Sequence, residues 1–144
     1  MSIRGRHILI VDDYPDAVDI WALYLRSLGF DVSTAGDGET AVSKAEQLRP
    51  DLIVLDLELP GISGFEAAKR LRRNLSTHDI PLIAATGYSH HRQLAMARDA
   101  GFDAIVVKPV EPDSLVEHIK RLLDHMVGVR QPNHMVRDSA QQNG

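Results

Sequence analysis

Five short runs of mostly apolar residues are spaced along the chain, and segments with helical periodicity separate them. The apolar runs cover residues 7–11, 30–34, 52–55, 82–85 and 104–107. In the segments between and after them, at about residues 15–28, 41–48, 65–75, 94–100 and 112–126, apolar residues recur every three or four positions. That spacing places the apolar residues on one face of a helix. Strands that alternate with helices of this length predict βαβ units and a parallel sheet, because a parallel return needs a crossover of about a dozen residues.

The order of the strands is predicted from how apolar each run is. Three of the runs are apolar at nearly every position, which is typical of strands covered on both faces. Residues 30–34 instead alternate between apolar and polar side chains, as an edge strand half open to water does. The pattern favours a flavodoxin-like (βα)5 fold, an α/β doubly wound parallel sheet with strand order 2-1-3-4-5.

The length of 144 residues suits one domain with a sizeable core. We expect an N-terminal extension at residues 1–6 and the domain at residues 7–126. After Met126 the helical periodicity fails, and Gly, Pro, Gln, Asn and Ser become frequent. Residues 127–144 are therefore predicted to form a flexible C-terminal tail.

Composition narrows the function classes. The net charge of −4 gives no large basic field, so binding of nucleic acid through bulk electrostatics is not expected. The absence of cysteine excludes disulfide scaffolds and thiolate metal sites. No apolar run approaches the roughly 18 residues of a membrane span, and the N-terminus lacks the apolar stretch of a signal peptide. We expect a cytoplasmic protein that does not bind membranes.

Polar residues suited to phosphoryl chemistry follow four of the apolar runs. Asp12 and Asp13 follow the first run, Asp56 the third, Thr86 the fourth and Lys108 the fifth. The carboxyl ends of parallel strands lie along one edge of a sheet, so these side chains should meet in one crevice.

Three clustered carboxylates are unfavourable unless a cation or a proton relieves their repulsion, and a divalent ion is the natural choice. Two unit charges about 4 Å apart repel by roughly 4 kcal/mol at an effective dielectric constant near 20. All-oxygen ligands suit a hard divalent ion, and so few carboxylates favour Mg²⁺ over Ca²⁺, with Mn²⁺ as a substitute.

A carboxylate at such a site can act as a nucleophile and form an aspartyl phosphate. The transferred group then needs its three outer oxygens compensated. The metal, the Lys108 ammonium, and the Thr86 hydroxyl with a nearby backbone N–H would each take one. Gly87 leaves the approach to the phosphoryl group open.

Taken together, these motifs resemble those of the receiver domain of two-component response regulators, over about residues 5–126. The resemblance rests on four segments in order and at family spacing: Asp12-Asp13, the segment 56–64 (DLELPGISG), Thr86-Gly87 and Lys108-Pro109. It implies that Asp56 accepts a phosphoryl group from a sensor histidine kinase or a histidine phosphotransfer protein. It also implies Mg²⁺ bound by Asp13, Asp56 and the backbone carbonyl of Glu58, with Asp12 acting through water, and a cis Lys108-Pro109 peptide bond.

The resemblance further implies a switch rather than an enzyme, one that assists only its own Mg²⁺-dependent phosphorylation and dephosphorylation. Thr86 would move toward the phosphoryl group and alter the face made by the fourth helix, fifth strand and fifth helix. A downstream protein would bind this face, and the chain would be a monomer or a phosphorylation-dependent dimer. Ile105 replaces the aromatic residue that the family uses in this switch, so the usual aromatic movement cannot operate.

We expect a stand-alone receiver whose output is protein binding. The alternative from an enzyme class is a phosphatase or phosphotransferase of the haloacid dehalogenase type, which also pairs a strand-end aspartate with an acid two residues later, as Asp56 and Glu58 do. Such enzymes carry the nucleophile on the first strand, whereas Asp56 follows the third. A flavodoxin-type electron carrier shares the topology, but the acidic segment after the first strand has the wrong charge for a flavin phosphate. The basic cluster Lys69, Arg70, Arg72 and Arg73 is interpreted as a solvated helix face.

Overall fold

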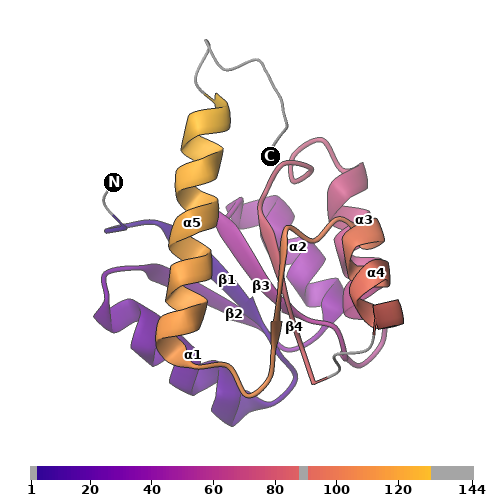
Figure 1. The fold of residues 1–144 in the computed structure, drawn as a ribbon, viewed down its shortest axis with the longest axis horizontal. Helices are drawn as coiled ribbons and strands as arrows, with labels where there is room; N and C mark the ends of the chain where they lie inside the picture. The colour runs from indigo at the N-terminus through magenta and orange to yellow at the C-terminus, as the bar shows by residue number, and fades with distance from the viewer. Residues whose placement is uncertain (1–2, 88–90, 131–144) are drawn as a thin grey trace.

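Five parallel strands form one sheet in the order β2-β1-β3-β4-β5, as the sequence predicts (Figure 1). The structure is a computed structural model that describes residues 3–87 and 91–130, with side chains described as far as 125. The strands are β1 (His7–Val11), β2 (Asp31–Ala35), β3 (Leu52–Asp56), β4 (Leu82–Thr86) and β5 (Ala104–Val107). The helices are α1 (Pro15–Ser27), α2 (Gly38–Leu48), α3 (Gly64–Arg73), α4 (His91–Ala100) and α5 (Pro112–Arg130). The chain therefore has the flavodoxin-like fold.

The sheet lies between two helical layers, each with its own core. Helices α1 and α5 cover one face, and α2, α3 and α4 cover the other (Figure 1). Strands β3 and β4 are buried along their whole length, whereas β2 is exposed or half-buried at all but its last position. The alternating pattern of the second run thus marked the edge strand correctly.

The strand register brings the predicted site residues to one edge. Asp56 pairs with Ala85 on β4, and Thr86 pairs with Val107 on β5. Asp12 continues the register beyond β1, because its backbone N–H donates to the Ala35 carbonyl at 3.1 Å. Asp12 and Lys108, which are 96 positions apart in the sequence, therefore lie side by side.

Helix α3 ends earlier than its apolar spacing predicts. Leu75 was expected in the helix, but α3 stops at Arg73 and Leu75 is 89% exposed. The buried Thr77 hydroxyl donates to the Leu71 carbonyl at 2.7 Å, and the Thr77 N–H donates to the Asn74 carbonyl. This turn satisfies groups at the helix terminus, so the helix does not continue.

One member of the basic cluster on α3 is not solvated. The Arg72 guanidinium is half-buried and donates to the carbonyls of Gly101, His78 and Ile80. It also pairs with the Asp103 carboxylate at 3.0 Å. Arg72 therefore joins α3 to the end of α4 and the start of β5.

Helix α5 continues past the predicted end of the domain at residue 126 and reaches Arg130. Residues 131–144, most of the predicted tail, lie outside the described residues. None of the helices in the described part of the chain has both the length and the apolar content of a membrane span.

Candidate functional site

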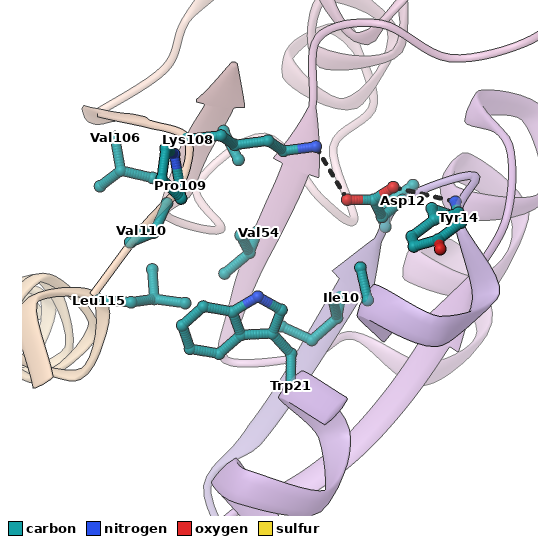
Figure 2. Close-up of a pocket in the computed structure, with 13 residues that line it drawn as sticks. Ile10, Asp12, Tyr14, Trp21, Val54, Val106, Lys108, Pro109, Val110 and Leu115 are labelled. Carbon is teal, nitrogen blue, oxygen red and sulfur yellow. Dashed lines mark hydrogen bonds and ion pairs between the residues drawn. The ribbon is translucent and has the colours of Figure 1, made fainter. Parts of the chain in front are cut away.

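Lys108 reaches across the carboxyl edge of the sheet to the acids of β1 and β3. Its backbone N–H donates to the Thr86 carbonyl at 2.8 Å, which anchors it beside β4. The Lys108-Pro109 peptide bond is cis, as the resemblance implies. The ammonium Nζ lies 3.0 Å from Asp12 Oδ2 and 2.9 Å from Asp56 Oδ2 (Figure 2 draws the pair with Asp12). One cation thus joins the two strand ends.

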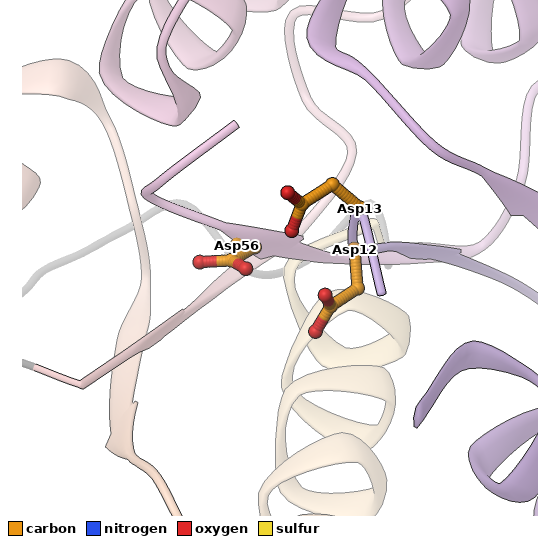
Figure 3. A group of neighbouring side chains, drawn as sticks. All are labelled: Asp12, Asp13 and Asp56. Atoms are coloured by element: carbon orange, nitrogen blue, oxygen red, sulfur yellow. The ribbon is translucent and has the colours of Figure 1, made fainter. Parts of the chain in front are cut away.

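Asp12, Asp13 and Asp56 converge at the same edge (Figure 3). Each offers a carboxylate oxygen, and these oxygens all lie within 4.8 Å of one another. Asp13 is exposed, Asp12 is half-buried and Asp56 is 3% exposed. The donors are all oxygens and carry more negative charge than Lys108 balances, so the three side chains fit a hard divalent cation.

Asp56 is held on both of its carboxylate oxygens. Oδ1 accepts a hydrogen bond from the Glu58 backbone N–H at 3.0 Å, and Oδ2 accepts one from Lys108. The side chain follows Leu55 at the end of a strand that is buried throughout. Its orientation is therefore fixed by the backbone and by one cation.

Gly64 supports the Asp56 backbone from behind. A Cβ at position 64 would lie 2.2 Å from the Asp56 carbonyl oxygen and 2.7 Å from Leu57 Cα. The Gly64 N–H also donates to the Leu57 carbonyl at 3.0 Å. Only glycine lets the backbone at position 64 come this close to the Asp56 backbone. This positioning role of Gly64 was not predicted from the sequence. The available signal was a glycine directly behind the helix cap Ser63, eight residues after the acid.

Burial and charge act in opposite directions on the two central groups. Burial raises the pKa of the Asp56 carboxyl, although the Glu58 N–H and Lys108 pull it down; nearby Asp12 adds to the rise. Burial alone would lower the pKa of Lys108, but its hydrogen bonds and ion pairs with Asp56 and Asp12 outweigh this and raise it. Lys108 therefore stays charged. The negative charge of the Asp56 carboxylate is unfavourable in its buried position, and a second cation nearby would stabilise it.

The other predicted site residues lie around this cluster. Thr86 is fully buried at the end of β4, and its carbonyl anchors Lys108. The Glu58 side chain is exposed, and its N–H contacts Asp56. The roles expected for the Thr86 hydroxyl and the Glu58 carbonyl stay predictions. Ile105 is half-buried and packs against the core under α3 and α4.

Comparison with known proteins agrees with this geometry. The family model described as the response regulator receiver domain matches residues 8–120. The DNA-binding response regulator MtrA of Mycolicibacterium smegmatis is 33% identical over 123 residues, which cover 85% of this chain and 53% of that protein. The DNA-binding dual master transcriptional regulator RpaA of Synechocystis is 38% identical over 116 residues, 81% of this chain and 48% of that protein.

One of the similar solved structures contains a metal ion. The receiver domain of a sensor histidine kinase from Pseudomonas aeruginosa, with a magnesium ion coordinated in its active site cleft, is 31% identical with a TM-score of 0.78. The match covers 83% of this chain and 98% of that one.

The chain spans about half the length of the curated relatives it matches. Both relatives named above are described as DNA-binding. The expectation that this chain binds no nucleic acid therefore stays a prediction.

Proposed function

Because the chain belongs to the response regulator receiver domain family, we propose that Asp56 accepts a phosphoryl group from a phosphohistidine donor and thereby switches partner binding. The observation that carries the proposal is the position of Asp56. It is buried at a strand end, and Lys108 Nζ lies 2.9 Å from one of its oxygens, within the acid cluster. The donor would be a sensor histidine kinase or a histidine phosphotransfer protein.

In the transfer step, an Asp56 carboxylate oxygen attacks the phosphorus atom. The bond between phosphorus and the donor imidazole nitrogen breaks, its electron pair returns to the ring, and an acyl phosphate forms on Asp56. The Glu58 N–H holds the other carboxylate oxygen, which fixes the attacking direction. Lys108 already lies against Asp56 and needs no long movement to reach a phosphoryl oxygen.

Mg²⁺ is the metal that we propose for this site, held by Asp13, Asp56 and the Glu58 carbonyl, with Asp12 acting through water. When bound, it supplies positive charge for the phosphoryl oxygens. The acid cluster and the magnesium site of the Pseudomonas aeruginosa receiver support this assignment. We assign the Thr86 hydroxyl to a further phosphoryl oxygen, since Thr86 lies at the same edge.

The consequence of phosphorylation is a change in charge at the centre of this cluster. A phosphoryl group on Asp56 offers Lys108 new acceptors and alters its pairing with Asp12. Because the Thr86 carbonyl anchors the Lys108 backbone, β4 and β5 would respond together. We propose that a protein partner reads this change on the face of α4, β5 and α5, and that Ile105 takes part by packing rather than by an aromatic movement.

Intact-mass measurement tests the proposal. The chain is incubated with acetyl phosphate, with Mg²⁺ and with the metal removed by chelation. We expect the mass of one phosphoryl group to be added with Mg²⁺, to be largely lost under chelation, and to be absent in Asp56→Asn. Asp99→Asn, an exposed acid on α4, is the matched control and should be phosphorylated like the parent. An equal gain in Asp56→Asn would refute Asp56 as the acceptor.

An activity assay on the same protein preparation distinguishes the proposed switch from the haloacid dehalogenase alternative. A phosphatase would turn over a generic phosphomonoester such as p-nitrophenyl phosphate many times, whereas a switch would hold at most one phosphoryl group per chain. Sustained turnover that Asp56→Asn abolishes would favour the enzyme.

A further inference from the structure

A cavity lies beside the cluster of Asp12, Asp13 and Asp56, between α1, the sheet and the start of α5. Its volume is about 490 Å³, within the range of roughly 300 to 1,000 Å³ that is typical of sites for small organic molecules. We call it the α1–α5 cavity. Its apolar walls include Ile10, Val54, Val106, Trp21 and Leu115 (Figure 2). Ala17 also lines it.

The cavity is open because two small side chains face it. Ala17 on α1 and Ala85 on β4 line it where larger residues would fill it. Its outer wall is held in place by Trp21, whose ring meets Tyr24 edge to face with centroids 6.3 Å apart. The Tyr24 hydroxyl donates to Asp113 at the start of α5 at 3.1 Å. The two helices are thus tied together across the cavity.

Two side chains with hydrogen-bond donors, Trp21 and Lys108, line the cavity together with the Asp12 carboxylate. The Lys108 ammonium has three N–H groups, of which two are directed to Asp12 and Asp56. The indole N–H of Trp21 meets no acceptor within the described parts of the chain. Figure 2 shows the nitrogen-bearing edge of the indole turned toward Val54 on the sheet side of the cavity. Water there would satisfy these donors but would meet apolar walls on its other sides.

We propose that the α1–α5 cavity binds a flat, uncharged aromatic molecule that carries an acceptor oxygen, such as an aryl ketone. The apolar walls select the aromatic body, and the Trp21 and Lys108 donors select the oxygen. An anionic ligand is disfavoured by the neighbouring cluster, whose three carboxylates outnumber the one ammonium that pairs with Asp12 and Asp56. No step of the proposed phosphoryl transfer needs this ligand.

Three related probes test the proposal by nuclear magnetic resonance on the metal-free, unphosphorylated chain. Trp21 is the only tryptophan, so its indole N–H gives one assignable signal. We expect 2-acetylnaphthalene to shift this signal saturably. It should bind about fivefold more tightly than 2-ethylnaphthalene, which lacks the acceptor, and about tenfold more tightly than the anion 2-naphthoate. Because no phosphoryl donor is present, failure here leaves the proposed function intact.

A matched pair of variants on α1 separates the cavity from the surface. Ala17→Met fills the cavity and should weaken 2-acetylnaphthalene binding about tenfold. Leu23→Met changes the solvent side of the same helix, where Leu23 is 72% exposed, and should leave binding unchanged. Val110→Phe, at the half-buried rim, serves if Ala17→Met does not fold. Absence of a saturable shift, tightest binding of the anion, or equal binding by the filled variant would overturn the proposal.

Discussion

Replacing Asp56 by Asn should stabilise the metal-free chain at neutral pH. Asp56 is 3% exposed, and burial raises the pKa of its carboxyl, so its charge is unfavourable in the fold. Asn has nearly the same shape, and its amide oxygen accepts a hydrogen bond from Lys108 as the carboxylate does. Its NH2 group cannot accept from the Glu58 N–H, so that hydrogen bond is lost at a cost of about 1 kcal/mol. The substitution therefore removes a charge while leaving the packing of the β3 end in place.

Besides this lost hydrogen bond, three electrostatic contributions set the size of the effect. At 2.9 Å from Lys108 the attraction is about 6 kcal/mol at an effective dielectric constant near 20. Repulsion by Asp12, whose oxygen lies within 4.8 Å, is about 3.5 kcal/mol on the same basis. Burying one carboxylate costs several kcal/mol more. The balance favours the neutral side chain, and we expect the free energy of unfolding to rise by about 1 to 3 kcal/mol.

The pH dependence has a definite sign. A carboxyl whose pKa is higher in the folded state contributes stability below its unfolded pKa of about 3.8, and this contribution is lost as pH rises through the folded pKa. The advantage of Asp56→Asn should therefore vanish at acid pH and grow toward neutrality. Mg²⁺ should act in the opposite direction, because binding to the parent at a hundred times its Kd adds about 2.7 kcal/mol that the variant loses.

Urea unfolding of the parent and variant across pH, with and without Mg²⁺, measures these differences. Asp99→Asn removes an exposed charge far from the site and should change the free energy of unfolding by less than about 0.5 kcal/mol. A metal-free Asp56→Asn that is less stable than the parent at neutral pH, or equally altered at every pH, would refute this account of the cluster.

Three further substitutions test the support of the site. Gly64→Ala should lower the free energy of unfolding by about 2 kcal/mol, because its Cβ would lie 2.2 Å from the Asp56 carbonyl oxygen, whereas Gly36→Ala, with open space around it, should not; chemical denaturation would decide. Arg72→Lys should lower the free energy of unfolding by about 2 kcal/mol, because one Lys ammonium cannot donate to the Gly101 and Ile80 carbonyls together. Arg73 is exposed, and Arg73→Lys should leave the free energy of unfolding unchanged in the same assay. Lys108→Met leaves Asp12 and Asp56 without their cation and should lower the free energy of unfolding by about 2 kcal/mol at pH values below the unfolded Lys pKa of 10.5. This difference from the parent should disappear as the pH rises through the raised pKa of Lys108 in the folded state. A difference that persists in alkali would contradict the role of Lys108.

Features that depend on periodicity were predictable from the sequence. The alternation in residues 30–34 identified the edge strand, and the continuous apolar runs identified the covered ones, which together gave the strand order. Once the strands were parallel, the convergence of Asp12, Asp56 and Lys108 followed from topology alone. Their ion pairs confirm it.

Features that depend on particular contacts were not predictable. The apolar spacing that placed Leu75 in the third helix says nothing about Thr77, whose hydroxyl takes the Leu71 carbonyl and helps to end that helix. A guanidinium in a basic helical segment is expected to be solvated. The sequence does not indicate that carbonyls of other segments accept hydrogen bonds from Arg72. The α1–α5 cavity has the same origin, since two alanines far apart in sequence have to face the same space.

The most direct test of phosphoryl transfer to Asp56 identifies the modified residue chemically. The chain is phosphorylated with acetyl phosphate and Mg²⁺ and then reduced with borohydride, which converts an acyl phosphate to the primary alcohol, so that a modified aspartate becomes homoserine. Peptide mapping by mass spectrometry then locates the change. Our account predicts homoserine at position 56 alone, and homoserine at Asp12 or Asp13, or at no acidic residue, would contradict it.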